Sequence, residues 1–307
     1  MQLASQLTYT KINPPTSPTS KYDIEYFKDN KTLLDFENIK YINTTKTRYT
    51  DYFFYYVSDS IIGESLKHYG EYTEHEINLL NLLIQNDYII YDIGANIGYH
   101  TLGLAQKAKH VYAFEPNECN YRLLKLNTAH KSNVTLFDYA ISDDIGVTQI
   151  ERFVPGTVGN YGECRITDNG QLCNMTTIDY LVENDDILPP HLVKIDVEGH
   201  EWEVIQGMDE TIRNYKPTIF YENMHGDNLG KVWTYLNDLG YEIFYFPCMN
   251  YNPNNFKQNN NNVFGNGGVM NALAISPSLE AKTNLFRIIS ADDTWEQALK
   301  RNNVQRN

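Results

Sequence analysis

A glycine turn at residues 92–98, Asp-Ile-Gly-Ala-Asn-Ile-Gly, follows an apolar run that predicts a strand. Gly94 and Gly98 would let the backbone turn sharply and approach a ligand closely. The helix expected after them would point its N-terminal N–H groups into the same space, which suits a carboxylate or a phosphate. The pattern therefore predicts a ligand site, although an ordinary strand–turn–helix unit would look similar.

An acidic residue strengthens this interpretation. Glu115 comes 21 positions after Gly94, at the end of the next predicted strand. A carboxylate placed there can accept hydrogen bonds from both hydroxyls of a ribose. The glycine spacing is G-x-x-x-G and not the G-x-G-x-x-G of dinucleotide sites. S-adenosylmethionine (SAM) fits better, because its methionine ammonium and carboxylate suit Asp92 beside a helix N-terminus.

A second acidic group lies further along the chain. Asp196 and Glu198 belong to the segment Lys-Ile-Asp-Val-Glu-Gly-His-Glu at 194–201, and Glu222 ends a later apolar run. Alternation along a strand would place Asp196 and Glu198 on one side. Ligands of parallel sheets bind beyond the carboxyl ends of the strands. We therefore expect these three carboxylates to converge near a transferred group.

This group predicts catalysis on a hydroxyl. A general base, for which Asp196, Glu198, Glu222 and His200 are the candidates, accelerates such a reaction by about 10²–10⁴-fold. Alternatively, Asp196 and Glu222 would hold a Mg²⁺ ion that lowers the pKa of the hydroxyl. A structural interpretation is also open, in which Asp196 caps the next helix and Glu198 favours its N-terminus.

The elements that position these residues alternate between strand and helix. Such alternation implies a mainly parallel sheet with helices on both faces. The predicted strands are 88–94, 110–116, 134–141, 192–198, 218–223, 241–246 and 269–276. The predicted helices are 74–85, 99–107, 118–131, 200–214 and 227–239. Residues 145–180 are expected to form an inserted hairpin region, and 250–268 to be disordered or a functional loop.

The alternation also suggests domain boundaries. Residues 1–20 are rich in Pro, Ser and Thr and predict a flexible leader. A β-prone extension over 21–71, a main domain over 72–280 and a C-terminal helix or tail over 281–307 complete the expected organisation.

Composition excludes several classes of protein. The net charge of −14 argues against a nucleic-acid partner. No apolar run approaches the roughly 18–20 residues that span a bilayer, and no secretory signal is recognisable. The four cysteines form no C-x-x-C pair, so free thiols in a reducing cytoplasm are expected.

Four blocks together resemble one family. "YDIGANIGYHTLGLA", "VYAFEPNECNYRLLKLN", "YAISDDIG" and "LVKIDVEGHEWEVIQG" look like FkbM-type methyltransferases, in the right order and over about residues 72–221. The resemblance implies a class I methyltransferase fold, a Rossmann-like, mostly parallel sheet of seven strands. It also implies SAM as methyl donor and O-methylation of a sugar or a related hydroxyl compound.

The resemblance also implies residue roles. Asp92, Gly94, Asn96 and Gly98 would hold the methionine end of SAM, and Glu115 its ribose. The turn at 138–143, with Asp138 and Ser142, would flank the adenine. Pro116 is counted with the cofactor site, whereas Phe114 is expected to be a core residue. The family motif commonly has Ala at the position of His200, which argues against a general role for that side chain.

Other functions stay open at this point. The acceptor would be a lipid or polyketide hydroxyl in one alternative, and in another the chain would be a non-catalytic SAM-fold module of glycan assembly. For a glycan acceptor, we expect binding between 145–180 and 250–268, because Asn side chains donate and accept hydrogen bonds together. The sequence predicts no oligomeric state.

Overall fold

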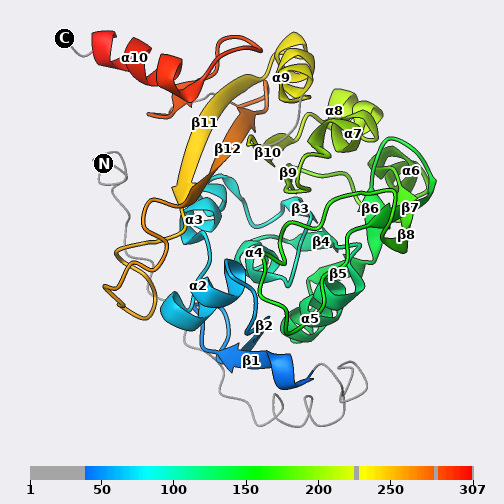
Figure 1. Cartoon of the computed structure of the whole chain (residues 1–307). Helices are drawn as coiled ribbons and strands as arrows, with labels where there is room; N and C mark the ends of the chain where they lie inside the picture. The colour runs from blue at the N-terminus through cyan, green and yellow to red at the C-terminus, as the bar shows by residue number, and fades with distance from the viewer. Residues whose placement is uncertain (1–38, 225–227, 280–282, 306–307) are drawn as a thin grey trace.

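The computed structural model describes residues 39–224, 228–279 and 283–305. The predicted leader at 1–20 and the first part of the 21–71 extension lie outside the described residues. Within them, a short 3₁₀ helix η3 (Ile39–Tyr41) leads into a hairpin of β1 (Ile42–Thr45) and β2 (Phe53–Tyr56). This hairpin lies at the lower edge of the molecule in Figure 1.

A single large sheet organises the main domain, as expected from the alternation of elements. Its order is β13-β11-β12-β10-β9-β3-β4-β5. Its strands are β3 (Ile89–Ile93), β4 (His110–Phe114), β5 (Val134–Phe137), β9 (Leu192–Ile195), β10 (Thr218–Glu222), β11 (Glu242–Met249), β12 (Gly268–Ile275) and β13 (Phe286–Arg287). The five from β5 to β10 run parallel, while β12 is antiparallel to both its neighbours. This is the predicted class I methyltransferase sheet of seven strands, extended by the short edge strand β13.

Helices cover both faces of this sheet (Figure 1). They are α3 (Glu74–Leu83), α4 (Tyr99–Leu104), α5 (Glu118–Thr128), α7 (Glu201–Gln206), α8 (Asp209–Tyr215) and α9 (Leu229–Asp238), with α10 (Trp295–Gln305) beyond them. Successive strand residues point to opposite faces. Tyr91 accordingly joins the core cluster that contains Val204 of α7, whereas Ile90 joins the cluster that contains Leu80 of α3. Burial on both faces explains why the strands are continuously apolar.

Two helices were not predicted. Helix α2 (Ile62–Tyr69) lies in a segment for which strands were expected. Its buried Ile62, Leu66 and Tyr69 are spaced four and three residues apart, which is a helical pattern, and Gly70 ends it at φ 68°. The prediction of strands rested on β-prone residues and was wrong there. Helix α6 (Ile178–Glu183) follows the insertion, capped by the Thr177 side chain.

Two predicted elements are divided in the structure. The strand expected over 134–141 breaks at the exposed Asp138, where the chain leaves the large sheet. Its second part, β6 (Tyr139–Ile141), joins β7 (Gly146–Ile150) and β8 (Gln171–Thr176) in a small sheet. The hairpin of β7 and β8 confirms the predicted insertion. The helix expected over 200–214 is interrupted between α7 and α8.

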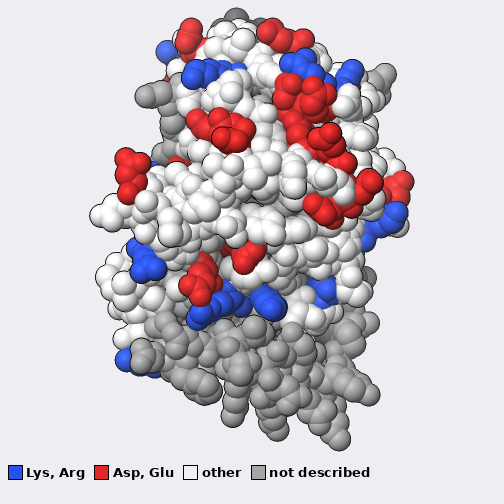
Figure 2. Space-filling model, turned by 90° about the vertical axis from the view of Figure 1, so that its right-hand side faces the viewer, with Lys and Arg blue, Asp and Glu red and all other residues white. Residues whose placement is uncertain are grey.

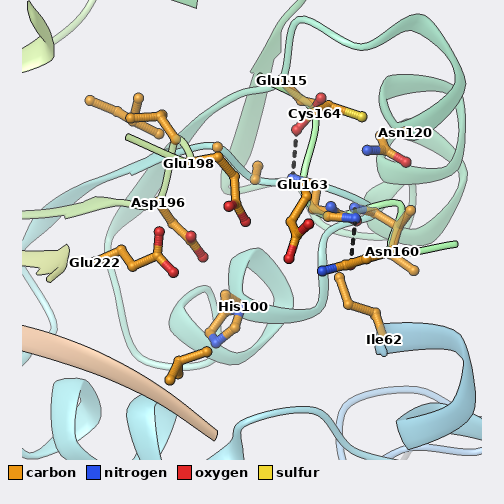
Figure 3. A pocket seen from close by; sticks show the side chains of 18 of the residues that line it. Ile62, His100, Glu115, Asn120, Asn160, Glu163, Cys164, Asp196, Glu198 and Glu222 are labelled. Atoms are coloured by element: carbon orange, nitrogen blue, oxygen red, sulfur yellow. Dashed lines mark hydrogen bonds between the residues drawn. The ribbon is translucent and has the colours of Figure 1, made fainter. Parts of the chain in front are cut away.

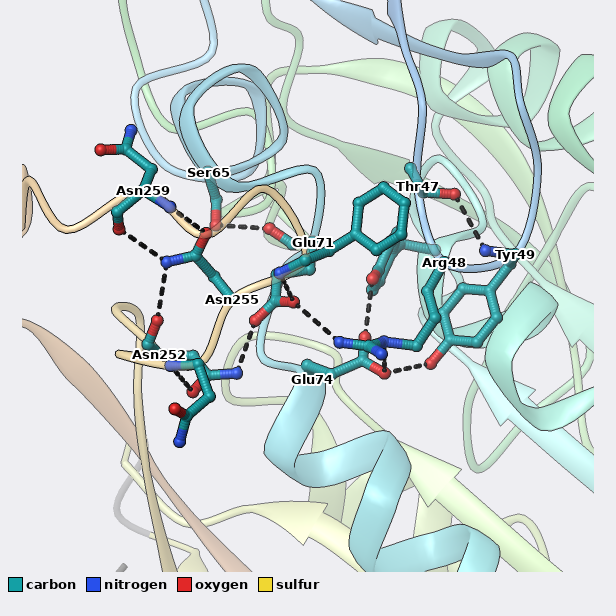
Figure 4. Close-up of polar contacts among 12 residues, drawn as sticks. Thr47, Arg48, Tyr49, Ser65, Glu71, Glu74, Asn252, Asn255 and Asn259 are labelled. Atoms are coloured by element: carbon teal, nitrogen blue, oxygen red, sulfur yellow. Dashed lines mark hydrogen bonds and ion pairs between the residues drawn. The ribbon is translucent and has the colours of Figure 1, made fainter. Parts of the chain in front are cut away.

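The Asn-rich loop between β11 and β12 is packed against α2 (Figure 4). Asn252 Nδ2 and the backbone N–H of Phe256 each donate a hydrogen bond of 2.7 Å to the Glu71 carboxylate. Lys257 Nζ reaches the carbonyl oxygens of Leu66 and Lys67 at the end of α2. Of the two expectations for residues 250–268, disorder is therefore wrong.

The excess of acidic over basic residues in the sequence is visible on the surface. Figure 2 shows one face on which Asp and Glu side chains gather in the upper half, while Lys and Arg side chains form smaller groups. In the described parts of the chain, no helix is long and apolar enough to cross a bilayer.

Candidate active site

A cavity of about 230 Å³ opens beyond the carboxyl ends of the parallel strands (Figure 3). Its wall combines the turn after β3, the end of β4, the segment after β9 and the end of β10. The insertion adds Asn160, Gly162, Glu163 and Cys164, the start of the loop after β11 adds Asn250, and β12 adds Asn271. Segments far apart in the sequence thus enclose one space.

The glycine turn has the geometry that its sequence predicts. Gly94 has φ 80°, and a Cβ there would lie 1.8 Å from the carbonyl oxygen of Asp196. Gly98 has φ 91°, and a Cβ there would lie 2.7 Å from Leu124 Cδ1. Both positions need glycine for conformation and for space. Because Gly94 presses directly on the backbone of Asp196, this turn also fixes the second acidic group.

Glu115 is held rigidly at the end of β4. Its carboxylate accepts hydrogen bonds of 2.8 Å from the backbone N–H groups of Asn96 and Asn117. Burial raises its pKa to about 7, although these two donors act in the opposite direction. A carboxylate has about four acceptor positions, so it can still accept bonds from a ligand in the cavity.

Asn120 of α5 offers another acceptor at the wall. It is almost fully buried and donates through Nδ2 to the carbonyl oxygen of Tyr161 at 3.2 Å. Its Oδ1 has no hydrogen-bond partner among the described residues. Because buried polar atoms are nearly always paired, this oxygen suits a donor from a molecule in the cavity.

The three predicted carboxylates do converge. Asp196, Glu198 and Glu222 each place one oxygen within 4.8 Å of the other two, and Figure 3 shows them side by side. The reason differs from the predicted alternation, because β9 ends at Ile195. Glu198 instead adopts φ 57° in the following turn, which brings its side chain back toward Asp196.

Crowding of these carboxylates changes their titration. Burial, followed by the charge of Asp196, raises the pKa of Glu198 to about 8 and that of Glu222 to about 9. Glu163 of the insertion also raises the pKa of Glu198. This end of the cavity therefore binds protons strongly, as do many sites of acid–base chemistry.

Lys194 supplies a positive charge from within β9. Its side chain is 1% exposed, and its Nζ lies 3.1 Å from Asp196 Oδ2 and 3.5 Å from Asp92 Oδ1. Burial by itself lowers the pKa of this ammonium, but Asp196 and Asp92 outweigh burial and hold the pKa above its usual range. Lys194 thus links the two acidic motifs beneath the cavity floor.

His200, one of the predicted candidate bases, contacts two polar side chains. Its Nε2 lies 2.9 Å from Ser142 Oγ, and its Nδ1 lies 3.5 Å from Glu203. Burial lowers its pKa, while Glu203 and Asp143 oppose that effect. The imidazole still lines the cavity, so a role as base stays a prediction.

Most predicted residues reach the cavity wall. They are Gly94, Asn96, Glu115, Pro116, Asp196, Glu198, His200 and Glu222. Phe114, expected in the core, is fully buried and also touches the cavity. The remaining predicted residues, Asp92, Gly98, Asp138 and Ser142, are absent from the wall formed by the described residues. Asp92 is fully buried, with Thr101 Oγ1 donating to it at 2.6 Å, and Asp138 is exposed.

Sequence reasoning assigned no role to Glu163, Asn120 or Lys194. Glu163 and Asn120 reach the cavity only through tertiary folding, and no local pattern announces them. His100 contacts Glu76 at 3.2 Å and Thr73 at 2.9 Å on the wall opposite Glu115. Lys194 did have a signal, because a lysine inside an otherwise apolar strand requires a buried partner.

Known proteins resemble the region that builds this cavity. Residues 92–243 match the family described as Methyltransferase FkbM domain. That match begins at Asp92 and includes the glycine turn, Glu115 and the three carboxylates. This segment, just under half of the chain, is similar to the FkbM methyltransferase domain.

Individual relatives match only part of this chain and part of their own length. Hexuronic acid methyltransferase AglP of Haloferax volcanii is 32% identical over 144 residues, which are 45% of this chain and 59% of that protein. The matched region therefore spans about three fifths of the curated relative. A solved structure of Methyltransferase FkbM from Methylobacillus flagellatus KT is 18% identical, with a TM-score of 0.41, and the match covers 62% of this chain and 44% of that one.

Proposed function

We propose that the protein is a SAM-dependent O-methyltransferase whose acceptor is a hydroxyl of a sugar or glycan. The observation that carries the proposal is the cavity that joins the glycine turn and Glu115 to three clustered carboxylates. The glycine turn and Glu115 offer contacts for the methionine part and the ribose of SAM. The carboxylate cluster offers a base for a hydroxyl. The FkbM domain and the relative AglP support the same activity.

The residues at the wall fit SAM. The Glu115 carboxylate, fixed by two backbone donors, is available to the ribose hydroxyls. The turn at Gly94 and Asn96 would lie along the methionine part. Strand β6 would give the adenine a largely apolar wall, formed by Tyr139, Ala140 and Ile141. Bound there, SAM would supply an electrophilic methyl group on its sulfonium.

The chain's own groups would do three things. The wall orients the acceptor hydroxyl toward the methyl group, and positioning of this kind is worth up to about 7–11 kcal/mol. Asp196 accepts the hydroxyl proton, and Lys194 Nζ, which donates a 3.1 Å hydrogen bond to Oδ2, orients this carboxylate. The insertion and the Asn250 loop exclude water from the donor.

A divalent cation is an alternative use of the same carboxylates. Asp196 and Glu222, the predicted ligands, together with Glu198 would present three oxygens to a Mg²⁺ ion, which prefers oxygen ligands. The acidic group alone favours neither the base nor the ion. Activity that survives exhaustive chelation would rule out the ion.

Other features of the proposal come from composition. We keep the cytoplasm as the compartment and exclude nucleic acid as a partner on the grounds of free thiols and net charge. A lipid or polyketide hydroxyl is the alternative acceptor.

A transfer assay tests the proposed function. The protein is incubated with SAM that carries a deuterated methyl group and with separate saccharide, lipid and polyketide alcohols, and products are analysed by mass spectrometry. We expect labelled methyl ethers of saccharides. If only lipid or polyketide products carry the label, the proposed saccharide acceptor is wrong. If calorimetry shows no SAM binding, the proposed methyltransferase activity is wrong.

A further inference from the structure

The charge of the cavity wall narrows the acceptor class. Six carboxylates line the cavity, and the wall formed by the described residues contains no Lys or Arg. Two of the six already have hydrogen-bond partners, since Glu76 accepts a 3.0 Å bond from Asn271 and Glu115 accepts backbone bonds. The other four, Glu163, Asp196, Glu198 and Glu222, surround the reacting end.

The nearby cations leave this end acidic. Lys194 is buried behind Asp196, and the half-exposed Arg165, which does not line the cavity, has its Nη2 4.0 Å from Glu198 Oε2. Figure 3 shows Glu163 extending into the same space as Glu198. An anionic sugar placed among these four acidic side chains would face no Lys or Arg on the described wall and would be disfavoured there.

The chemistry of the nucleophile points the same way. A sugar carboxylate is already ionised and needs a cation to hold it, not a base. A hydroxyl needs a base, and a carboxylate is a suitable base. The acidic end of the cavity therefore matches a hydroxyl nucleophile on an uncharged or positively charged sugar.

Resting on the proposed methyltransferase function, we propose that the acceptor is a neutral or amino sugar and that uronic acids are excluded by Glu163 and the three carboxylates beside it. In the transfer, the sugar oxygen forms a bond to the methyl carbon, and the methyl–sulfur bond breaks with its electron pair going to sulfur. The hydroxyl proton passes to Asp196. The selectivity differs from the substrate named for the relative AglP, which is a hexuronic acid.

Three matched acceptors test this selectivity. They are the methyl glycosides of glucose, of glucosamine and of glucuronic acid, the last with its carboxylate free. The wild type is expected to methylate the first two with kcat/KM at least about tenfold above that of the glucuronide. Added salt should reduce this ratio, because it screens the repulsion. Each assay is run with and without EDTA.

Reversing the charge of Glu163 tests whether this residue causes the selectivity against glucuronide. Glu163→Lys should raise glucuronide kcat/KM relative to glucoside by about tenfold or more. Asp168→Lys is the matched control, because Asp168 is an exposed residue of the same insertion and does not line the cavity. The Asp168→Lys variant should keep the wild-type ratio of glucuronide to glucoside kcat/KM.

The outcomes separate the two proposals. Glucuronide methylated as well as glucoside, or methylated well only when a divalent ion is present, overturns the charge selectivity and leaves the methyltransferase intact. An unchanged ratio in Glu163→Lys overturns the role of Glu163. SAM binding without methylation of any saccharide overturns the proposed acceptor, and the selectivity falls with it.

Discussion

Replacing Lys194 by Met tests the link between the two acidic motifs. The change removes the cation that lies 3.5 Å from Asp92, a carboxylate with no solvent exposure. Among the described residues, the 2.6 Å hydrogen bond from Thr101 Oγ1 would then be the remaining contact that stabilises that charge. Breaking a buried ion pair from one side typically costs about 3–5 kcal/mol. That is a large share of the roughly 5–15 kcal/mol that stabilises an ordinary domain.

Urea unfolding followed by circular dichroism measures this cost. We expect Lys194→Met to lose about 3–5 kcal/mol and the double variant Asp92→Asn/Lys194→Met to recover much of it, because neutral groups replace the pair. Lys67→Met is the control, since its partner Glu64 is 2.7 Å away at an exposed surface, where a pair is worth about 1 kcal/mol or less. Equal losses in Lys194→Met and Lys67→Met, or losses that simply add in the double variant, would refute this reasoning.

Three further predictions concern the cofactor, the pH dependence and the loop. Glu115→Ala should weaken SAM binding in calorimetry by about 1.5–3 kcal/mol, the scale of charge-assisted hydrogen bonds; unchanged affinity would contradict the ribose assignment. The raised pKa of Glu222, about 9, contributes stability that is complete below the unfolded pKa near 4.5 and is lost as pH rises toward 9. Thermal unfolding without SAM should therefore show a falling midpoint over that range, with a smaller slope in Glu222→Gln; identical slopes would refute this. Glu71→Ala removes the acceptor of Asn252 and Phe256, so it should expose the loop to limited proteolysis and raise KM for the acceptor, while SAM affinity stays within a few-fold. A loop as resistant as in the wild type would contradict the anchoring.

The sequence predicted the parts of the fold that repeat a simple physical pattern. Buried parallel strands are continuously apolar, so β3 and β10 could be recognised together with the motifs at their ends. Strand ends were less predictable, because an apolar run does not show where hydrogen bonding to the neighbour stops. The run at 134–141 is an example, since its two halves pair with different sheets.

The candidate site shows the same division. The glycine turn, Glu115 and the three carboxylates could be placed at one sheet edge because parallel strands all end there. Contacts across large sequence separations could not, such as His200 with Ser142, 58 residues apart, or the approach of Glu163 to Glu198. These depend on how the insertion folds over the sheet, for which the sequence offers no local pattern.

Single-turnover methyl transfer by the wild type and by Asp196→Asn tests the central claim most directly. Both proteins are loaded with SAM, mixed with an excess of a saccharide acceptor and sampled over time for labelled methyl ether, while SAM affinity is measured by calorimetry. The account predicts SAM affinities within a few-fold of each other and transfer at least about 10²-fold slower in Asp196→Asn. Transfer at the wild-type rate by Asp196→Asn would show that the carboxylate cluster of this cavity does not carry the reaction.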